Sequence, residues 1–220
     1  MSVFRAFIAA LSALVCFGFA ASAQEEIRSF DVEIEVQQDG DIVVTERIAI
    51  NVEGREIRRG IFCELPAFYL DETGGKLPYR YDVIEVRRDG ADEPYERERI
   101  GNAVRVRIGD ANRYLDYRVH VYEIRYRVKN RIQYADNQDE FYWNVTGSYW
   151  LFPIQSATAR ITLPAGTQIT TTDIYTGGRE DTEENAVYSL VDKTHDFETT
   201  LTLGEREGLH ISRGNAKRVL

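Results

Sequence analysis

Residues 30–50 read FDVEIEVQQDGDIVVTERIAI, and this stretch decides the fold. In residues 30–36 apolar side chains alternate with acidic ones, which is the two-residue period of a half-buried β-strand. Asp39-Gly40-Asp41 is a signal for a hairpin turn, and residues 42–50 continue as a partner strand. The stretch therefore predicts an antiparallel β-hairpin.

The same alternation recurs along the rest of the chain, between turns that contain Gly, Asp or Pro. No segment after residue 23 carries a convincing apolar stripe at helical spacing. Many short strands between such turns predict a single all-β domain, an antiparallel β-sandwich that is immunoglobulin-like in general architecture. Residues 176–185 are expected to form an exposed loop. Further strands are expected at residues 81–87, 104–108, 118–128, 157–163, 168–175, 186–190 and 197–203.

Residues 1–23 have the features of a signal peptide. Arg5 supplies a positive end, and an apolar run follows over residues 6–20. Ala21-Ser22-Ala23 is the small-x-small pattern that a signal peptidase cuts. We therefore expect export, with Gln24 as the mature N-terminus, to the periplasm or the extracytoplasmic face of the membrane.

Two alternatives to cleavage fit the N-terminus less well. A membrane anchor needs roughly 20 apolar residues, and this apolar run is shorter. Lipid attachment at Cys16 usually follows a small residue, whereas Leu14 and Val15 precede it here. The expected organisation is a signal peptide over residues 1–23, an extracytoplasmic domain over 24–212, and a C-terminal tail over 213–220.

Composition and charge exclude some classes of function. The 220 residues are 43% hydrophobic and 29% charged, which is typical of a folded domain. The formal net charge of −9 argues against a nucleic-acid partner, because phosphate contacts need clustered Lys and Arg. Once the signal peptide is removed, Cys63 is the single cysteine and no internal disulfide can form. Its apolar surroundings favour a small buried hydrophobe over a nucleophile.

The search for chemistry yields no catalytic motif, and no cofactor or metal is predicted. His195 stands beside Asp196, but neighbouring strand residues point to opposite faces and do not easily share a metal. Residues 136–140 read DNQDE and offer oxygen ligands of the kind that calcium prefers, without the frame of an EF-hand. A solvated acidic loop is the favoured interpretation. The 36 acidic residues leave open a pair of carboxylates in a hydrolase.

Both tryptophans lie in two aromatic segments, FYWN at residues 141–144 and YWLFPI at residues 149–154. Aromatic surfaces of this kind can bind sugar or peptide. The favoured alternative is that the tryptophans fill the core of the sandwich. The candidate partner-binding residues combine these segments, their acidic neighbours and an arginine turn: Arg58, Arg59, Asp139, Glu140, Tyr142, Trp143, Tyr149 and Trp150.

Several landmarks occur in order along the chain: DG at 39–40, VTE at 44–46, RGIF at 59–62, LP at 65–66, YEIRYRV at 122–128, DEFYWNVTG at 139–147, PI at 153–154, LPAG at 163–166 and YTG at 175–177. No single landmark is specific, but together they resemble the domain-of-unknown-function family 2207, a family of predicted membrane proteins, over about residues 28–212. The resemblance implies an N-terminal extracytoplasmic β-rich domain behind a signal peptide, usually followed by transmembrane helices, and it assigns no functional residue.

The expected function is that of an exported, non-catalytic binding module for a partner protein or an envelope component. The alternative is a carboxylate-dependent hydrolase of envelope polysaccharide, using Glu123, Asp139 or Glu140. A purely structural role in a membrane assembly lies between the two. No hydrophobic segment follows the last expected strand in this sequence. Because the resemblance implies transmembrane helices after the domain, membrane association is expected if the native product extends beyond Leu220.

Overall fold

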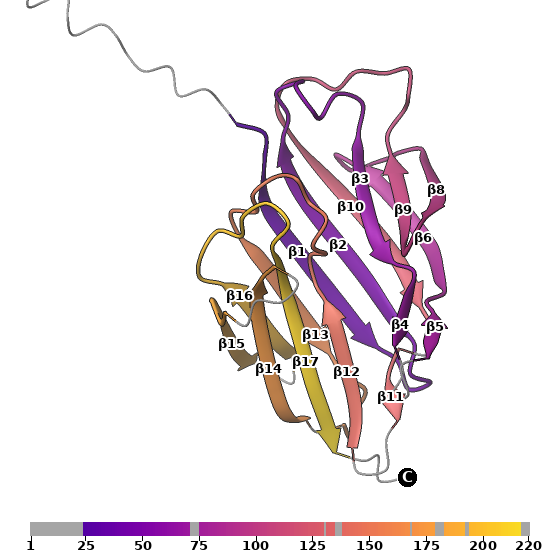
Figure 1. Ribbon diagram of the computed structural model, residues 1–220, viewed down its shortest axis with the longest axis vertical. Helices are drawn as coiled ribbons and strands as arrows, with labels where there is room; N and C mark the ends of the chain where they lie inside the picture. The colour runs from indigo at the N-terminus through magenta and orange to yellow at the C-terminus, as the bar shows by residue number, and fades with distance from the viewer. Residues whose placement is uncertain are drawn as a thin grey trace, which may run out of the picture.

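The computed structural model describes residues 24–70, 75–129, 131–134, 138–167, 169–178, 183–191 and 194–216. Over these residues the regular secondary structure consists of β-strands (Figure 1). The expected signal peptide, residues 1–23, lies outside the described residues. A search of the described part of the chain finds no helix that is both long and apolar enough to cross a membrane.

The largest sheet has eight strands and contains the hairpin predicted from residues 30–50. Strands β1 and β2 pair antiparallel from Val36↔Ile42 to Glu26↔Asn51, with a turn that Gly40 enters at a φ of 85°. A positive φ strains other residues but not glycine, so the turn signal had a physical basis. In sheet order the strands are β15 (Ala186–Val191), β16 (Thr194–Thr199), β13 (Ala157–Thr162), β1 (Glu26–Val36), β2 (Ile42–Asn51), β10 (Val119–Val128), β6 (Tyr81–Arg88) and β7 (Ala91–Asp92).

The pairing of β1 with β13 corrects the expectation of a purely antiparallel sandwich. These two strands run parallel, with Phe30 opposite Ala157 and Glu35 opposite Thr162. Parallel neighbours need a long crossover, and here the intervening chain builds strands in other sheets before it returns to β1. Alternation along one strand shows which face is buried but not which strand lies beside it.

Smaller sheets form the second layer of the sandwich (Figure 1). One has the order β11 (Gln133–Tyr134), β12 (Gln138–Asn144), β17 (Gly208–Ala216) and β14 (Ile169–Gly177). The other has the order β3 (Ile61–Pro66), β9 (Ala103–Ile108) and β8 (Tyr95–Ile100). A separate hairpin joins β4 (Phe68–Leu70) to β5 (Lys76–Pro78).

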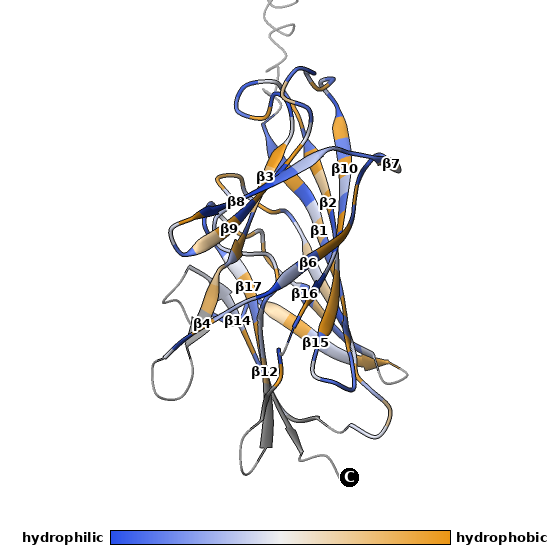
Figure 2. Cartoon of the chain, turned by 90° about the vertical axis from the view of Figure 1, so that its right-hand side faces the viewer, coloured by the Kyte–Doolittle hydropathy of each residue, from blue (hydrophilic) through white to orange (hydrophobic). Residues whose placement is uncertain are grey.

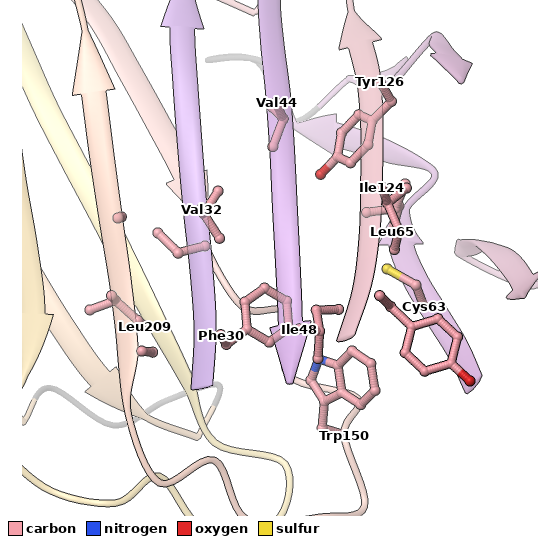
Figure 3. Packing of buried hydrophobic residues seen from close by; sticks show 14 of the residues in the cluster. Phe30, Val32, Val44, Ile48, Cys63, Leu65, Ile124, Tyr126, Trp150 and Leu209 are labelled. Atoms are coloured by element: carbon pink, nitrogen blue, oxygen red, sulfur yellow. The ribbon is translucent and has the colours of Figure 1, made fainter. Parts of the chain in front are cut away.

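One continuous core joins the large sheet to both smaller ones. Phe30, Val32 and Val44 enter it from the first hairpin, Leu209 from β17, and Leu65 from β3 (Figure 3). Hydrophobic and hydrophilic residues alternate along the central strands, as the colours of Figure 2 show. The all-β sandwich is confirmed. It is larger than an immunoglobulin domain, which has seven to nine strands in total, because one sheet alone here has eight.

Several expected boundaries differ from the structure. The loop expected at residues 176–185 begins inside β14, which continues to Gly177, and Thr176 is buried there. The strand expected at 197–203 is β16, which begins earlier and ends at Thr199. The last strand, β17, continues to Ala216, so residues 213–216 of the expected tail belong to a sheet. Cross-strand partners that are distant in sequence set the limits of β16 and β17: β13 pairs with β16, and β12 pairs with β17.

Candidate functional site

A groove of about 300 Å³ lies between the start of β3 and the loop at residues 147–152. Phe62, Tyr149 and Leu151 line it, and each exposes more than half of its side chain, at 52%, 53% and 56%. Phe62 points outward because β3 alternates, with Ile61 and Cys63 facing the core. The groove therefore presents large apolar groups to solvent within a hollow.

Charged residues border the groove. Arg105 donates to Glu64 at 2.7 Å through its Nε, and its guanidinium also lies 5.1 Å from the centre of the Phe62 ring. The opposite charges of Arg105 and Glu64 therefore neutralise each other at the wall of the groove. Glu56, on the turn before β3, is exposed and also lines the hollow.

Arg58 and Arg59 lie on the turn at residues 55–60, before β3, which is called the arginine turn below. Glycines fix the position of this turn against the end of β9. Gly60 has a φ of 146° and Gly109 a φ of 130°. A Cβ at Gly60 would strike the carbonyl oxygen of Ile108, and one at Gly109 would strike the carbonyl oxygen of Arg59. The two backbones therefore pass so closely that only glycine fits, which holds the turn in place.

A buried carboxylate anchors the same turn from the other side. The Glu25 carboxylate accepts hydrogen bonds from the backbone N–H groups of Arg55 at 3.0 Å and Glu56 at 2.8 Å. Burial raises the pKa of Glu25, but the backbone donors outweigh this effect and leave the pKa below its usual value. The ionised form is therefore the one that holds the turn.

Arg58 and Arg59 are both exposed on this turn. The Arg58 Nε donates to the carbonyl oxygen of Arg55 at 2.7 Å. Arg59 donates to the Tyr114 hydroxyl at 2.5 Å and lies 4.2 Å from the centre of that ring. Both guanidinium groups thus stand at the surface beside neutral partners, and Tyr117 nearby is 74% exposed.

The two tryptophans among the candidate residues belong to the core, in agreement with the favoured alternative. Trp150 is 7% exposed, donates from its indole to the carbonyl oxygen of Thr146 at 2.8 Å, and meets Phe30 edge to face (Figure 3). Trp143 is 4% exposed and packs against Tyr79. Both rings support the sandwich, and Trp150 also lines the groove from its buried position.

The structure therefore divides the candidate residues. Tyr149 and Trp150 line the groove. The arginine turn contributes Glu56, Ile57 and Gly60 to its lining, whereas Arg58, Arg59 and Tyr142 are not among the lining residues. Tyr142 is exposed on β12 and its hydroxyl lies 3.1 Å from the Nδ1 of His210, whose pKa is lowered by burial. Asp139 and Glu140 occupy β12 by their backbone, and their side chains lie outside the described residues.

The carboxylates named for a hydrolase are not brought onto one sheet. Glu123 lies on β10 of the large sheet, in register with Arg47 and Arg87, while Asp139 and Glu140 lie on β12 of the second layer. Within the part of the chain that the structure describes, no group of three or more potential metal ligands occurs.

Sequence reasoning missed a carboxylate in the core. Glu46 is 3% exposed, and its two oxygens meet the Tyr126 hydroxyl at 2.5 Å and the Cys63 sulfur at 3.6 Å. Burial is the main cause that raises its pKa to about 7. The signal was available, since Glu46 shares the inward face of β2 with Val44 and Ile48.

The family model described as the N-terminal domain of predicted membrane proteins, DUF2207, matches residues 26–210. An uncharacterized protein of Escherichia coli K12, YciQ, is 31% identical over 166 residues. That match covers 74% of this chain but only 26% of the relative, so the chain spans about a quarter of that protein.

Solved structures share the fold at low identity. Yeast leukotriene A4 hydrolase in complex with bestatin matches with a TM-score of 0.55 and 12% identity, over 93% of this chain and 32% of that chain. The native form of the hydrolase from Saccharomyces cerevisiae matches with a TM-score of 0.52, over 86% of this chain and 29% of that chain. At this level of identity the likeness concerns the fold alone.

Proposed function

Because the chain belongs to the DUF2207 family of predicted membrane proteins, as its N-terminal domain, we propose that it is a non-catalytic, extracytoplasmic docking domain whose groove between β3 and residues 147–152 binds a partner protein. The features of a signal peptide at residues 1–23 support export. The observation that carries the proposed site is the set of exposed Phe62, Tyr149 and Leu151 side chains within one hollow.

The groove has the chemistry of a protein-binding hot spot. Such sites are rich in tyrosine and arginine and place apolar anchors at their centre, surrounded by polar groups. Here the apolar anchors share the groove with the compensated pair of Arg105 and Glu64 and with Glu56, Ile57 and Gly60 of the arginine turn. Isolated exposed apolar residues need no explanation, but three that line one hollow do.

Charge selects the kind of partner. Arg58 and Arg59 are exposed; Arg58 donates to a carbonyl oxygen, and Arg59 donates to the hydroxyl of Tyr114 and lies over its ring. A partner segment with an apolar side chain for the hollow and a carboxylate for this turn would complement both features. An envelope glycan stacked on Tyr149 is the competing occupant.

Site-specific photo-crosslinking in the native cell tests the proposal. A photoreactive amino acid is placed at position 149 or 151 in the groove, and at Ile84 as a control. Ile84 is 51% exposed but lies on β6, away from the residues that line the groove. We expect a discrete adduct from the groove positions alone, in which mass spectrometry identifies peptides of a second protein.

The charge of the turn gives a second measurement. Replacing both arginines by glutamine, Arg58→Gln with Arg59→Gln, should weaken the adduct while the protein remains folded, because neither side chain is buried. Adducts that carry no second polypeptide and shrink on treatment with glycan-degrading enzymes would replace the protein partner with an envelope component. Equal labelling from position 84 and from the groove would rule out the site.

A further inference from the structure

Strand β15 is the edge of the eight-stranded sheet, and its sequence is AVYSLV (Figures 1 and 2). Among the described residues, β16 is the strand that pairs with it, and its other side has no neighbour in the sheet. Val187, Leu190 and Val191 are 53%, 58% and 55% exposed. Edge strands are usually protected by charge, proline or a bulge, and β15 carries no charged residue, no proline and no shift of register.

The hydrogen bonds fix which backbone groups face outward. The N–H of Thr200 donates to the carbonyl oxygen of Asn185 at 2.9 Å, directly before the β15–β16 ladder begins. Bonded and non-bonded pairs alternate in an antiparallel ladder. The N–H and C=O groups of Ala186 and Leu190 therefore point away from β16, toward the outer side of the sheet.

The two faces beside this edge differ in chemistry. On one face, a hollow of about 420 Å³ is lined by Val187, Ser189 and four acidic residues, against a single arginine, Arg160. Arg160 donates to Asp196 at 2.8 Å, so its charge is already compensated. The acidic residues that line the hollow are Asp31, Glu33, Asp196 and Glu198.

The opposite face is apolar and aromatic. The Tyr188 ring stacks on His195 at 5.9 Å between ring centres and tilts against Phe197 at 5.3 Å. Leu190 shares the strand face of Tyr188 and is more than half exposed. An added strand would therefore meet acid on one side and apolar surface on the other.

We propose that β15 accepts an extended segment of a partner protein as a further strand of the sheet, with basic side chains over the acidic hollow and apolar ones beside Leu190. Main-chain hydrogen bonds supply the affinity in such an addition, and alternate side chains supply the specificity. A second copy of this chain is the less favourable occupant, because it would bring the acidic face of its own β15 beside this one, and the whole chain carries a net charge of −9.

A fluorescently labelled peptide of alternating lysine and valine is the probe. Its fluorescence anisotropy, measured as the full chain is added, reports binding. Leu190→Pro removes one outward N–H and leaves the hydrogen bonds to β16, which involve the alternate residues. Leu190→Thr is the matched control, because it keeps that N–H and the net charge. We expect the proline variant to lose at least tenfold in affinity and the threonine variant to stay within about threefold.

The charge of the hollow is tested separately with Glu198→Lys, a surface change that keeps the apolar edge. This variant should weaken the lysine peptide about tenfold and improve the binding of an alternating glutamate and valine peptide. Unchanged binding to a folded Leu190→Pro variant would show general attraction to an acidic protein and would overturn the proposal. Sedimentation that reveals a dimer, lost in Leu190→Pro, would overturn it in favour of a second copy.

Discussion

Glu46 should make the stability of this domain fall as the pH rises. Its carboxyl is buried in the folded state, where its pKa is about 7 against a usual value of 4.5. The folded protein therefore holds a proton that the unfolded chain releases, so stability is fully present below about pH 4.5 and is lost as the pH rises through about 7. Glu46→Gln removes the charge while its amide oxygen still accepts from Tyr126.

The size of the effect follows from the pKa difference. Each unit corresponds to about 1.36 kcal/mol, so the ionised carboxylate costs the fold about 3 kcal/mol above pH 7. We expect Glu46→Gln to differ little from the native protein at pH 5 and to be more stable by about 3 kcal/mol at pH 8. For a domain of this size that corresponds to about 6 to 12 °C in melting temperature.

Urea unfolding at pH 5 and pH 8 measures both free energies without adding salt. The variant must be compared with the native protein at each pH, because burial lowers the pKa of His210 and its contribution to stability has the opposite dependence on pH. Glu33→Gln, at an exposed position on β1, serves as the control and should show no such difference. Glu46→Gln should raise the free energy of unfolding more at pH 8 than at pH 5. If the two increases differ by less than about 1 kcal/mol, the buried Glu46 carboxyl does not cause the loss of stability at high pH.

Three further predictions follow from packing, backbone geometry and export. Trp150→Ala should lower the free energy of unfolding by about 3 to 5 kcal/mol, because Trp150 is buried, whereas Tyr149→Ala should lower it by less than about 1 kcal/mol. Chemical denaturation measures both losses, and equal losses would contradict the burial of Trp150. Gly60→Ala should lower the melting temperature by several degrees, because its Cβ meets the backbone of β9; an unchanged temperature would contradict that close approach. Intact-mass measurement of the native product should give Gln24 as the N-terminus, and a product that still begins at Met1 would exclude cleavage.

The sequence was sufficient for the parts of the fold that local periodicity determines. The first hairpin could be predicted because strand, turn and partner strand lie within residues 26–51, and alternation gives the buried face directly. The parallel pairing of β1 with β13 could not, because the Thr158 hydroxyl that donates to Asp31 is 127 residues away along the chain. Period-two patterns carry no information about such partners.

The residues that line the groove could be predicted only in part from the sequence. Tyr149 and Arg59 were chosen for residue type, and both proved to be exposed. Trp143 could have been assigned to the core from Phe141 and Val145, which share its face at a spacing of two. Phe62 was missed because it lines a groove whose other side is the loop at residues 147–152, and that loop approaches β3 only in the folded chain.

The docking surfaces proposed at the groove and at the β15 edge are separate, because no residue lines both hollows and they involve different sheets. If two partners use them, Leu151→Asp should abolish the groove adduct and leave the edge unaffected, and Leu190→Pro should do the reverse. If one partner spans both, its second contact is intramolecular, and either change alone should reduce the affinity far more than an isolated contact would. The double variant decides between the two arrangements. With two partners, it binds each partner no more weakly than the corresponding single variant does. With one partner that spans both surfaces, it binds that partner more weakly than either single variant.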